Sequence, residues 1–89
     1  MTDLAIVIVS YNARAELEAC LTQLHKAPPD VSHTIVVVDN DSSDRSADVV
    51  RTRWPKVTLI TTGDNLGYAR ANNIGIRATE SALVLLLNS

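Results

Sequence analysis

The side chains of this 89-residue chain that could do chemistry gather in four short polar segments, each directly after a run of apolar residues. The most acidic segment is DNDSSD at 39–44, which follows three valines. An ionised carboxylate only accepts hydrogen bonds, so an aspartate at this point can hold a base N–H, a ribose hydroxyl or a metal ion. Asp39 adds nothing to an apolar core, and we therefore predict that it contacts a ligand. Asp44 has a simpler role, because Ser42, Ser43 or Asp44 can cap a helix that follows.

Two of the other segments carry side chains that suit a nucleotide. Tyr11, in the segment SYN at 10–12, can lie flat against a nucleobase, although a tyrosine at the rim of the fold is an equal alternative. Arg70 presents a planar guanidinium that can pair with a diphosphate through two hydrogen bonds, and its alternative is a plain exposed arginine. Asn73 has poor propensity for a place inside a helix, which indicates that its side chain bonds a loop or a ligand.

The apolar pattern predicts the elements that must position these residues. Four short continuous apolar runs predict strands buried on both faces, at 4–9, 33–38, 57–60 and 83–87. Apolar spacing and proline breakers predict helices between them, at about 14–26, 45–53 and 68–79. Asn12 is the predicted cap of the first helix, and small residues such as Gly75 predict close packing of the third helix on the sheet. This alternation indicates an α/β fold on a parallel sheet, whose ligand lies beyond the carboxyl ends of the strands.

Composition and charge exclude several classes of protein. Eight basic and ten acidic residues give a net charge of −2 without a basic stripe, which argues against a nucleic-acid partner. The single cysteine, Cys20, cannot form an internal disulfide or a cysteine-built zinc site. There is no G-x-G-x-x-G or P-loop signature, no apolar run long enough to span a membrane, and no basic segment typical of a signal peptide at the start. We therefore expect a cytoplasmic protein.

Taken in order, three segments resemble the N-terminal half of the family 2 inverting glycosyltransferases, which have the GT-A fold. They are IVIVSYN at 6–12, VVVDNDSSD at 36–44 and NLGYARANNIG at 65–75. The third segment is most similar to the rhamnosyltransferase-like branch of that family. The segment LLLNS at 85–89 resembles the strand that leads into the metal-binding D-x-D-type motif.

The resemblance implies an open, mostly parallel sheet of about four strands in the order 3-2-1-4 with flanking helices, and a site for a nucleotide-diphosphate sugar. It assigns seven residues to that site: Ser10, Tyr11, Asp39, Asp41, Asn65, Arg70 and Asn73. By this likeness the first two line the nucleoside pocket, and Asp39 contacts the base or the ribose with Asp41 nearby. The last three shape the nucleotide side of the site.

The same resemblance implies parts that the chain does not carry. Mg²⁺ or Mn²⁺ would neutralise the leaving diphosphate, and its ligands are expected just after Ser89. The catalytic base and the half that binds a glycan or lipid-linked acceptor are expected further on. We therefore interpret 1–89 as a single truncated nucleotide-sugar-binding domain that is inactive alone and comes from an enzyme compatible with peripheral association at the inner face of a membrane. The run at 83–87 would then be a bare apolar edge, which predicts self-association.

Two other readings stay open on the sequence. Asp39 with Asp41 also resembles the start of a haloacid-dehalogenase-type phosphatase, and Asp39 with Asn40 resembles a receiver domain, both of which form a phosphoaspartate. Those families usually place this segment on the first strand, and Ser43 departs from the phosphatase pattern. The third reading is a noncatalytic interaction domain in which the acidic segment only caps a helix.

Overall fold

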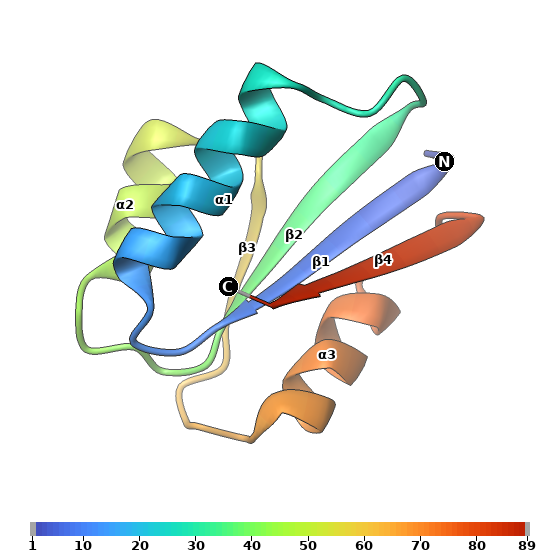
Figure 1. Cartoon of the computed structure of the whole chain (residues 1–89). Helices are drawn as coiled ribbons and strands as arrows, with labels where there is room; N and C mark the ends of the chain where they lie inside the picture. The colour runs from blue at the N-terminus through green and yellow to red at the C-terminus, as the bar shows by residue number, and fades with distance from the viewer. Residues whose placement is uncertain (1, 89) are drawn as a thin grey trace.

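A computed structural model describes residues 2–88 and contains strands and helices in strict alternation (Figure 1). The elements are β1 (Leu4–Ser10), α1 (Arg14–Lys26), β2 (His33–Asp39), α2 (Ser46–Arg53), β3 (Thr58–Thr61), α3 (Tyr68–Arg77) and β4 (Leu83–Asn88). Each predicted element is present. The predicted burial on both faces is correct for β1 and β2 but wrong for β3 and β4, because these two strands lie at the edges of the sheet and carry exposed residues. The largest difference lies at the end of α3, which stops at Arg77 because Ala78 and Thr79 form only a tightened last turn.

The strands form one parallel sheet in the order β3-β2-β1-β4, which confirms the order that the family resemblance implied. The register places Ser10 opposite Asp39 and Val9 opposite Asn88. Because all four strands run the same way, their carboxyl ends meet at one edge of the sheet. The polar segments that follow the strands therefore share that edge, as predicted.

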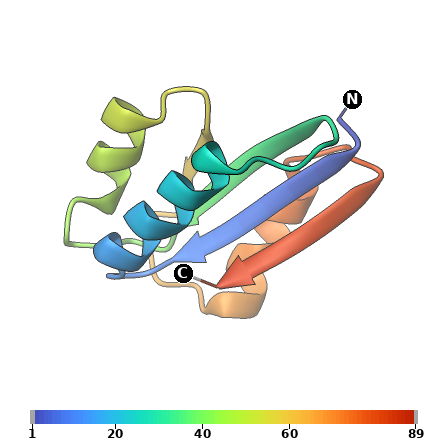
Figure 2. The same cartoon turned by 45° about the horizontal axis from the view of Figure 1, so that its top comes forward.

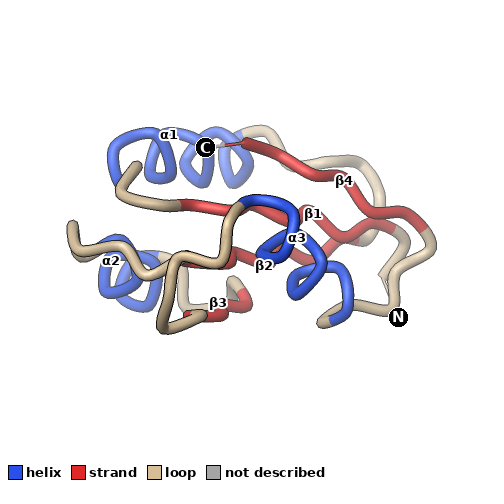
Figure 3. The backbone as a smooth tube through the Cα atoms, turned by 90° about the horizontal axis from the view of Figure 1, so that it is seen from below, coloured by secondary structure: helices blue, strands red, loops and turns tan. Residues whose placement is uncertain are grey.

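Helices cover both faces of the sheet, which explains why the two central strands are apolar without alternation. On one face α1 and α2 pack over residues such as Ile6 and Ile8, with Leu17 and Trp54 in the same core (Figure 2). On the other face α3 packs over the second set of strand residues, Val7, Val9, Val36 and Val38. Figure 3 shows α1 and α3 on opposite sides of β1.

Gly75 allows α3 to approach the sheet closely. A Cβ atom at this position would overlap Cγ1 of Val7 and lie 3.1 Å from Cγ2 of Val38. The close packing predicted from the small residues of this helix is thus confirmed, and it offsets the low helix propensity of glycine.

Among the described residues β4 pairs only with β1, so its other side is an open sheet edge. Four of its apolar side chains are exposed: Leu83, Val84, Leu85 and Leu86. Leu87, nearer the carboxyl edge, packs against the core under α1 and α2. The last strand therefore has the bare apolar character that the sequence predicted.

Candidate functional site

The strongest indication of a ligand comes from two neighbouring residues at the carboxyl ends of β1 and β2. Ser10 is 1% exposed and Asp39 is 3% exposed, and the two are paired in register. Oδ2 of Asp39 accepts a hydrogen bond of 3.2 Å from the backbone N–H of Ser42. Oδ1 of Asp39 and Oγ of Ser10 are buried and have no hydrogen-bond partner in the described part of the chain. Buried polar atoms are almost always paired in proteins, so these two oxygens mark a place where a ligand can supply the missing partner.

Asn40 supports the loops at this edge, and the sequence reasoning did not assign it a role in the site. It is 2% exposed, and its side chain makes four hydrogen bonds. Its Nδ2 donates to Oδ1 of Asn65 (3.0 Å) and to the carbonyl of Gly67, and its Oδ1 accepts from the N–H of Leu66 (3.0 Å) and the hydroxyl of Thr62 (3.2 Å). Asn40 therefore fastens the segment 62–67 to the end of β2.

This arrangement brings Asn65 to the site that contains Asp39. Asn65 is exposed, and its Oδ1 accepts hydrogen bonds from Asn40 and from the N–H of Gly67. The side-chain oxygen of Asn65 is thus used to shape the loop. Its amide nitrogen is a donor that makes no hydrogen bond within residues 2–88. The two asparagines are 25 residues apart in the sequence, so no local pattern indicated this contact.

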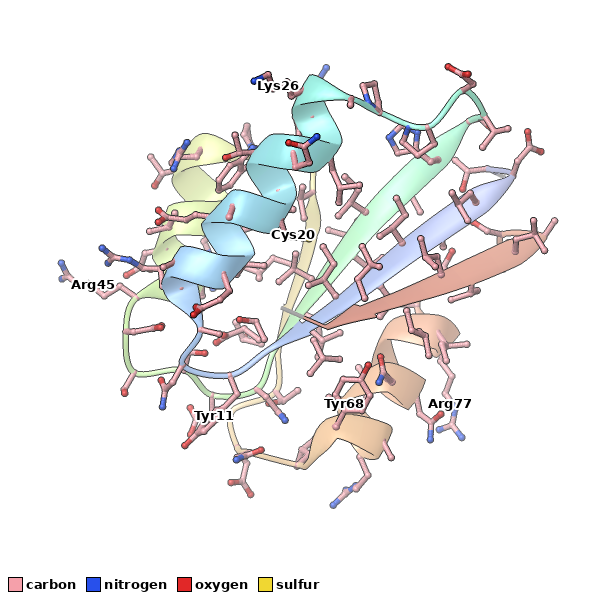
Figure 4. All side chains as sticks on the ribbon, viewed as in Figure 1. Tyr11, Cys20, Lys26, Arg45, Tyr68 and Arg77 are labelled. Atoms are coloured by element: carbon pink, nitrogen blue, oxygen red, sulfur yellow. The ribbon has the colours of Figure 1, made fainter. Side chains whose placement is uncertain are left out.

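Tyr11 and Asp41 also lie at the carboxyl edge, and both are exposed. Tyr11 is 49% exposed on the loop that joins β1 to α1, where its ring is open to a planar ligand (Figure 4). Asp41 adopts a left-handed backbone with φ of 69°. This conformation is uncommon outside glycine, and aspartate tolerates it better than most residues.

Arg70 and Asn73 lie apart from this group. They are one turn apart on the exposed side of α3, where they line a surface pocket with Ile74 and Arg77. Arg70 is in the first turn of the helix, next to the edge that holds Asn65, whereas Asn73 is further along it. Within residues 2–88, no hydrogen bond joins either residue to the other five predicted site residues.

Asp44 caps two helices at once, which extends its predicted role. Its Oδ1 accepts from the N–H of Ser46 (3.1 Å) at the start of α2 and also from the Ser46 hydroxyl, and its Oδ2 accepts from the N–H of Arg14 (3.0 Å) at the start of α1. Burial alone would raise the pKa of this carboxyl group, but these hydrogen bonds outweigh it and hold the pKa of Asp44 below its ordinary value.

The predicted cap at Asn12 is wrong. Ala13 occupies the cap position of α1 and makes no side-chain hydrogen bond there. Asn12 instead has φ of 48°, and its Oδ1 accepts hydrogen bonds from the N–H and the hydroxyl of Ser43. The physical reason is that a partner 31 residues away offers two donors, whereas capping would require a different backbone at Asn12.

The described residues hold no group of three or more histidine, cysteine, aspartate or glutamate side chains that could bind a metal ion. The prediction that cation ligands follow Ser89 concerns positions outside the described residues. No helix among the described residues has the length and apolar character needed to cross a membrane.

Comparison with known proteins agrees with the resemblance seen in the motifs. The family model described as glycosyl transferase family 2 matches residues 5–89. The N-acetylglucosaminyl-diphospho-decaprenol L-rhamnosyltransferases of two strains of Mycobacterium tuberculosis, CDC 1551 / Oshkosh and ATCC 25618 / H37Rv, are each 38% identical over 74 residues. That match covers 82% of this chain and 24% of each relative, so the chain spans about a quarter of the length of these curated relatives.

A solved mannosyltransferase from Pyrobaculum calidifontis, in complex with GDP-Man and Mn²⁺, has a similar fold. Its TM-score is 0.86 at 24% sequence identity, and the match covers 98% of this chain and 27% of the mannosyltransferase. The similarity in structure supports the GT-A assignment of the sheet and its helices. Because the family model extends over nearly the whole sequence, the chain belongs to glycosyl transferase family 2.

Proposed function

We propose that this chain forms the donor-nucleotide part of a glycosyltransferase that moves a sugar from a nucleotide-diphosphate sugar to an acceptor. The observation that carries the proposal is the pair of buried oxygens without partners, on Ser10 and Asp39, at the carboxyl edge of a parallel sheet. Nucleotides bind at this edge in open α/β sheets, and the family to which the chain belongs transfers sugars.

The roles of the residues follow from their placement. Oδ1 of Asp39 accepts a hydrogen bond from a base N–H or a ribose hydroxyl, and the Ser10 hydroxyl contributes a second polar contact. The exposed ring of Tyr11 stacks on the base. Asp41 and Asn65 lie on the two neighbouring loops at the same edge of the sheet.

We place Arg70 and Asn73 on the outer border of the nucleotide site. Arg70 is exposed in the first turn of α3, where its guanidinium can meet the diphosphate. A bound Mg²⁺ or Mn²⁺ would neutralise the charge of that diphosphate as it leaves. The described residues offer no group of three or more acidic, histidine or cysteine side chains to hold such a cation.

The acceptor and the place of action are inferred from the relatives. The names of the mycobacterial relatives specify a sugar carried on a diphospho-polyprenol, which supports a glycan or lipid-linked acceptor for the longer enzyme. A lipid-linked acceptor would place that enzyme in the cytoplasm at the inner face of a membrane. The exposed apolar edge of β4 supports self-association of the chain when nothing else covers that strand.

Calorimetry of the chain with UDP, dTDP and GDP, with and without Mn²⁺, tests the proposal. We expect at least one of the three to bind, and Asp39→Asn to weaken its binding about tenfold because one charge-assisted hydrogen bond is lost. Asp30→Asn is the matched control, since Asp30 is exposed in the loop before β2 at the opposite edge of the sheet. Absence of binding by all three nucleotides would refute the proposal, and covalent labelling of Asp39 by acetyl phosphate would support a phosphoaspartate protein instead.

A further inference from the structure

The loops that follow β1 and β2 are joined by a reciprocal set of hydrogen bonds. The N–H of Asn12 donates to Oγ of Ser42 (2.9 Å), and Oδ1 of Asn12 accepts from the N–H of Ser43 (2.8 Å) and from its hydroxyl (3.2 Å). All three residues are on the surface or partly buried, so the set is not explained by the need to satisfy a core. We call this set the Asn12 tie.

A second connection lies beside it. The carboxylate of Asp44 accepts from the first N–H of α1, at Arg14, and from the first N–H of α2, at Ser46, while Nη1 of Arg14 donates back to the carbonyl of Asp44 (3.2 Å). The first N–H groups of a helix lack intrahelical partners, and a negative charge is favourable there. One carboxylate therefore fixes the starts of two helices, and we call this set the Asp44 tie.

The Asn12 tie connects to the proposed nucleotide site through its neighbours, and the Asp44 tie begins at the residue after Ser43 of the Asn12 tie. Asn12 directly follows Tyr11, and Ser42, which accepts from Asn12, also donates its N–H to Oδ2 of Asp39. Three non-glycine residues in these loops have a left-handed backbone: Asn12, Asp41 and Arg45. Such a backbone persists only where the surrounding contacts hold it, and it gathers at functional sites. The two ties bond Asn12 itself and the residues on either side of Arg45.

We propose that Asn12 and Asp44 are positioning residues of the nucleotide site, which hold the loops after β1 and β2 together so that Tyr11 and Asp39 face one ligand. This inference rests on the proposed function, because it assumes that a nucleotide binds at this edge. Neither residue needs to touch the nucleotide. Their contribution is to order the loops before the ligand arrives, which lowers the entropy cost of binding.

Two pairs of variants separate positioning from a general effect on the fold. Asp44→Asn keeps the shape of the side chain but leaves only one of its two oxygens as an acceptor. The first N–H of either α1 or α2 therefore loses its hydrogen-bond acceptor. Asp48→Asn is its control, because Asp48 is also an acid in the first turn of α2 but is exposed and pairs only with Arg51. Asn12→Gly removes the side chain while tolerating a positive φ, and Asn12→Asp keeps both the acceptor and that tolerance.

The measurements are the dissociation constants for UDP, dTDP and GDP from NMR titration, and the hydrogen-exchange rates of the Arg14, Ser43 and Ser46 amides. They are made at a temperature where circular dichroism shows each variant fully folded. We expect Asp44→Asn and Asn12→Gly to weaken nucleotide binding about tenfold, because about one backbone residue must be ordered again when the nucleotide binds. We also expect hydrogen exchange to be faster at the amides that lose their acceptor. Asp48→Asn and Asn12→Asp are expected to stay within about twofold of the unmodified chain.

The outcomes distinguish this inference from the proposed function. Faster exchange with unchanged nucleotide affinity would show that the ties are structural only and would overturn the inference while the proposed function stands. Unchanged exchange in both variants would also overturn it. Failure of the unmodified chain to bind any of the three nucleotides would refute the proposed function and the positioning role together. If Asp44→Asn does not fold, the Asn12 pair decides the question.

Discussion

Ser10 and Asp39 are paired across β1 and β2, and each buries an oxygen atom that has no hydrogen-bond partner among residues 2–88. A core position would normally carry an apolar side chain at both places, as the strand residues before them do. The fold therefore carries the cost of two unsatisfied oxygens at the edge where its loops converge. A cost of this kind is expected where a site is prepared for a ligand.

The unsatisfied hydroxyl of Ser10 predicts a variant that stabilises the fold and weakens the site. Ser10→Ala removes a buried polar atom that gains nothing from the protein, so we expect the free energy of unfolding to rise by up to about 1 kcal/mol while nucleotide affinity falls. Urea denaturation followed by circular dichroism, together with a nucleotide titration, measures both effects.

Ser46→Ala is the matched control for this experiment. Ser46 is equally buried, but its hydroxyl donates to the carboxylate of Asp44, so its loss is expected to lower the free energy of unfolding by about 1 kcal/mol. Equal destabilisation by the two substitutions would mean that the Ser10 hydroxyl has a partner in solution, and the argument for a ligand at that atom would fail.

The side chain of Asn40 is predicted to be the main support of the segment 62–67. Asn40→Ala leaves the N–H of Leu66 without its acceptor and takes from Oδ1 of Asn65 one of its two donors, and we expect it to lower the free energy of unfolding by about 3 kcal/mol. Asn65→Ala removes one partner of Asn40 and is expected to cost about 1 kcal/mol. Similar, small effects of both substitutions in urea denaturation would contradict the role given to Asn40.

Local sequence patterns predicted some features of this structure and not others. Local patterns were sufficient for the elements: the apolar runs marked each strand, and Pro55 and the paired prolines after α1 marked helix ends. The strand order was not contained in those patterns and came from the resemblance to a family. Burial of Asp39 was foreseeable because it ends a valine run that is covered on both faces.

Contacts between loops were the part that local patterns missed. Asn12 looks like a cap because it lies just before a helical pattern, yet its partner Ser43 is distant in sequence. Asn40 was overlooked for the same reason, since its partner Asn65 becomes a neighbour only after β2 and β3 pair. Asp44 was assigned to the nearer of the two helices that it caps. Long-range partners for polar side chains cannot be read from spacing alone.

Asp44 is also expected to make the stability of the fold depend on pH. Its pKa is lowered in the folded state, so its contribution is present above its unfolded pKa, near pH 4, and is lost as the pH falls through the folded value. The guanidinium of Arg14 donates to the backbone carbonyl of Asp44, and Arg14 lines a surface pocket with four other charged residues, Glu18, Arg45, Asp48 and Arg53.

Urea denaturation between pH 7 and pH 3 measures this dependence. We expect the free energy of unfolding of the unmodified chain to fall as the pH is lowered. In Asp44→Asn the slope of this free energy against pH is expected to be smaller. Asp48→Asn is expected to keep most of the slope, because the ion pair of Asp48 with Arg51 is exposed and contributes little. An unchanged slope in Asp44→Asn would contradict the capping role.

The open edge of β4 predicts association of the chain with itself. Leu85 is 44% exposed on this strand, and a lysine at the same place would disfavour strand pairing with a second copy. Sedimentation velocity over a range of concentrations should show oligomers for the unmodified chain and fewer for Leu85→Lys. Thr58→Lys, on an exposed position of the opposite edge strand β3, should leave the oligomers in place. A single monomeric species at every concentration would rule this association out.

The most direct test of a nucleotide site at this edge is a map of amide chemical shifts during titration of the ¹⁵N-labelled chain with UDP, dTDP or GDP. Our account predicts that the largest changes fall in three segments, 10–12, 39–43 and 65–67, and that Asp39→Asn reduces them. Changes confined to the outer surface of α1 and α2, or none with any of the three nucleotides, would contradict it.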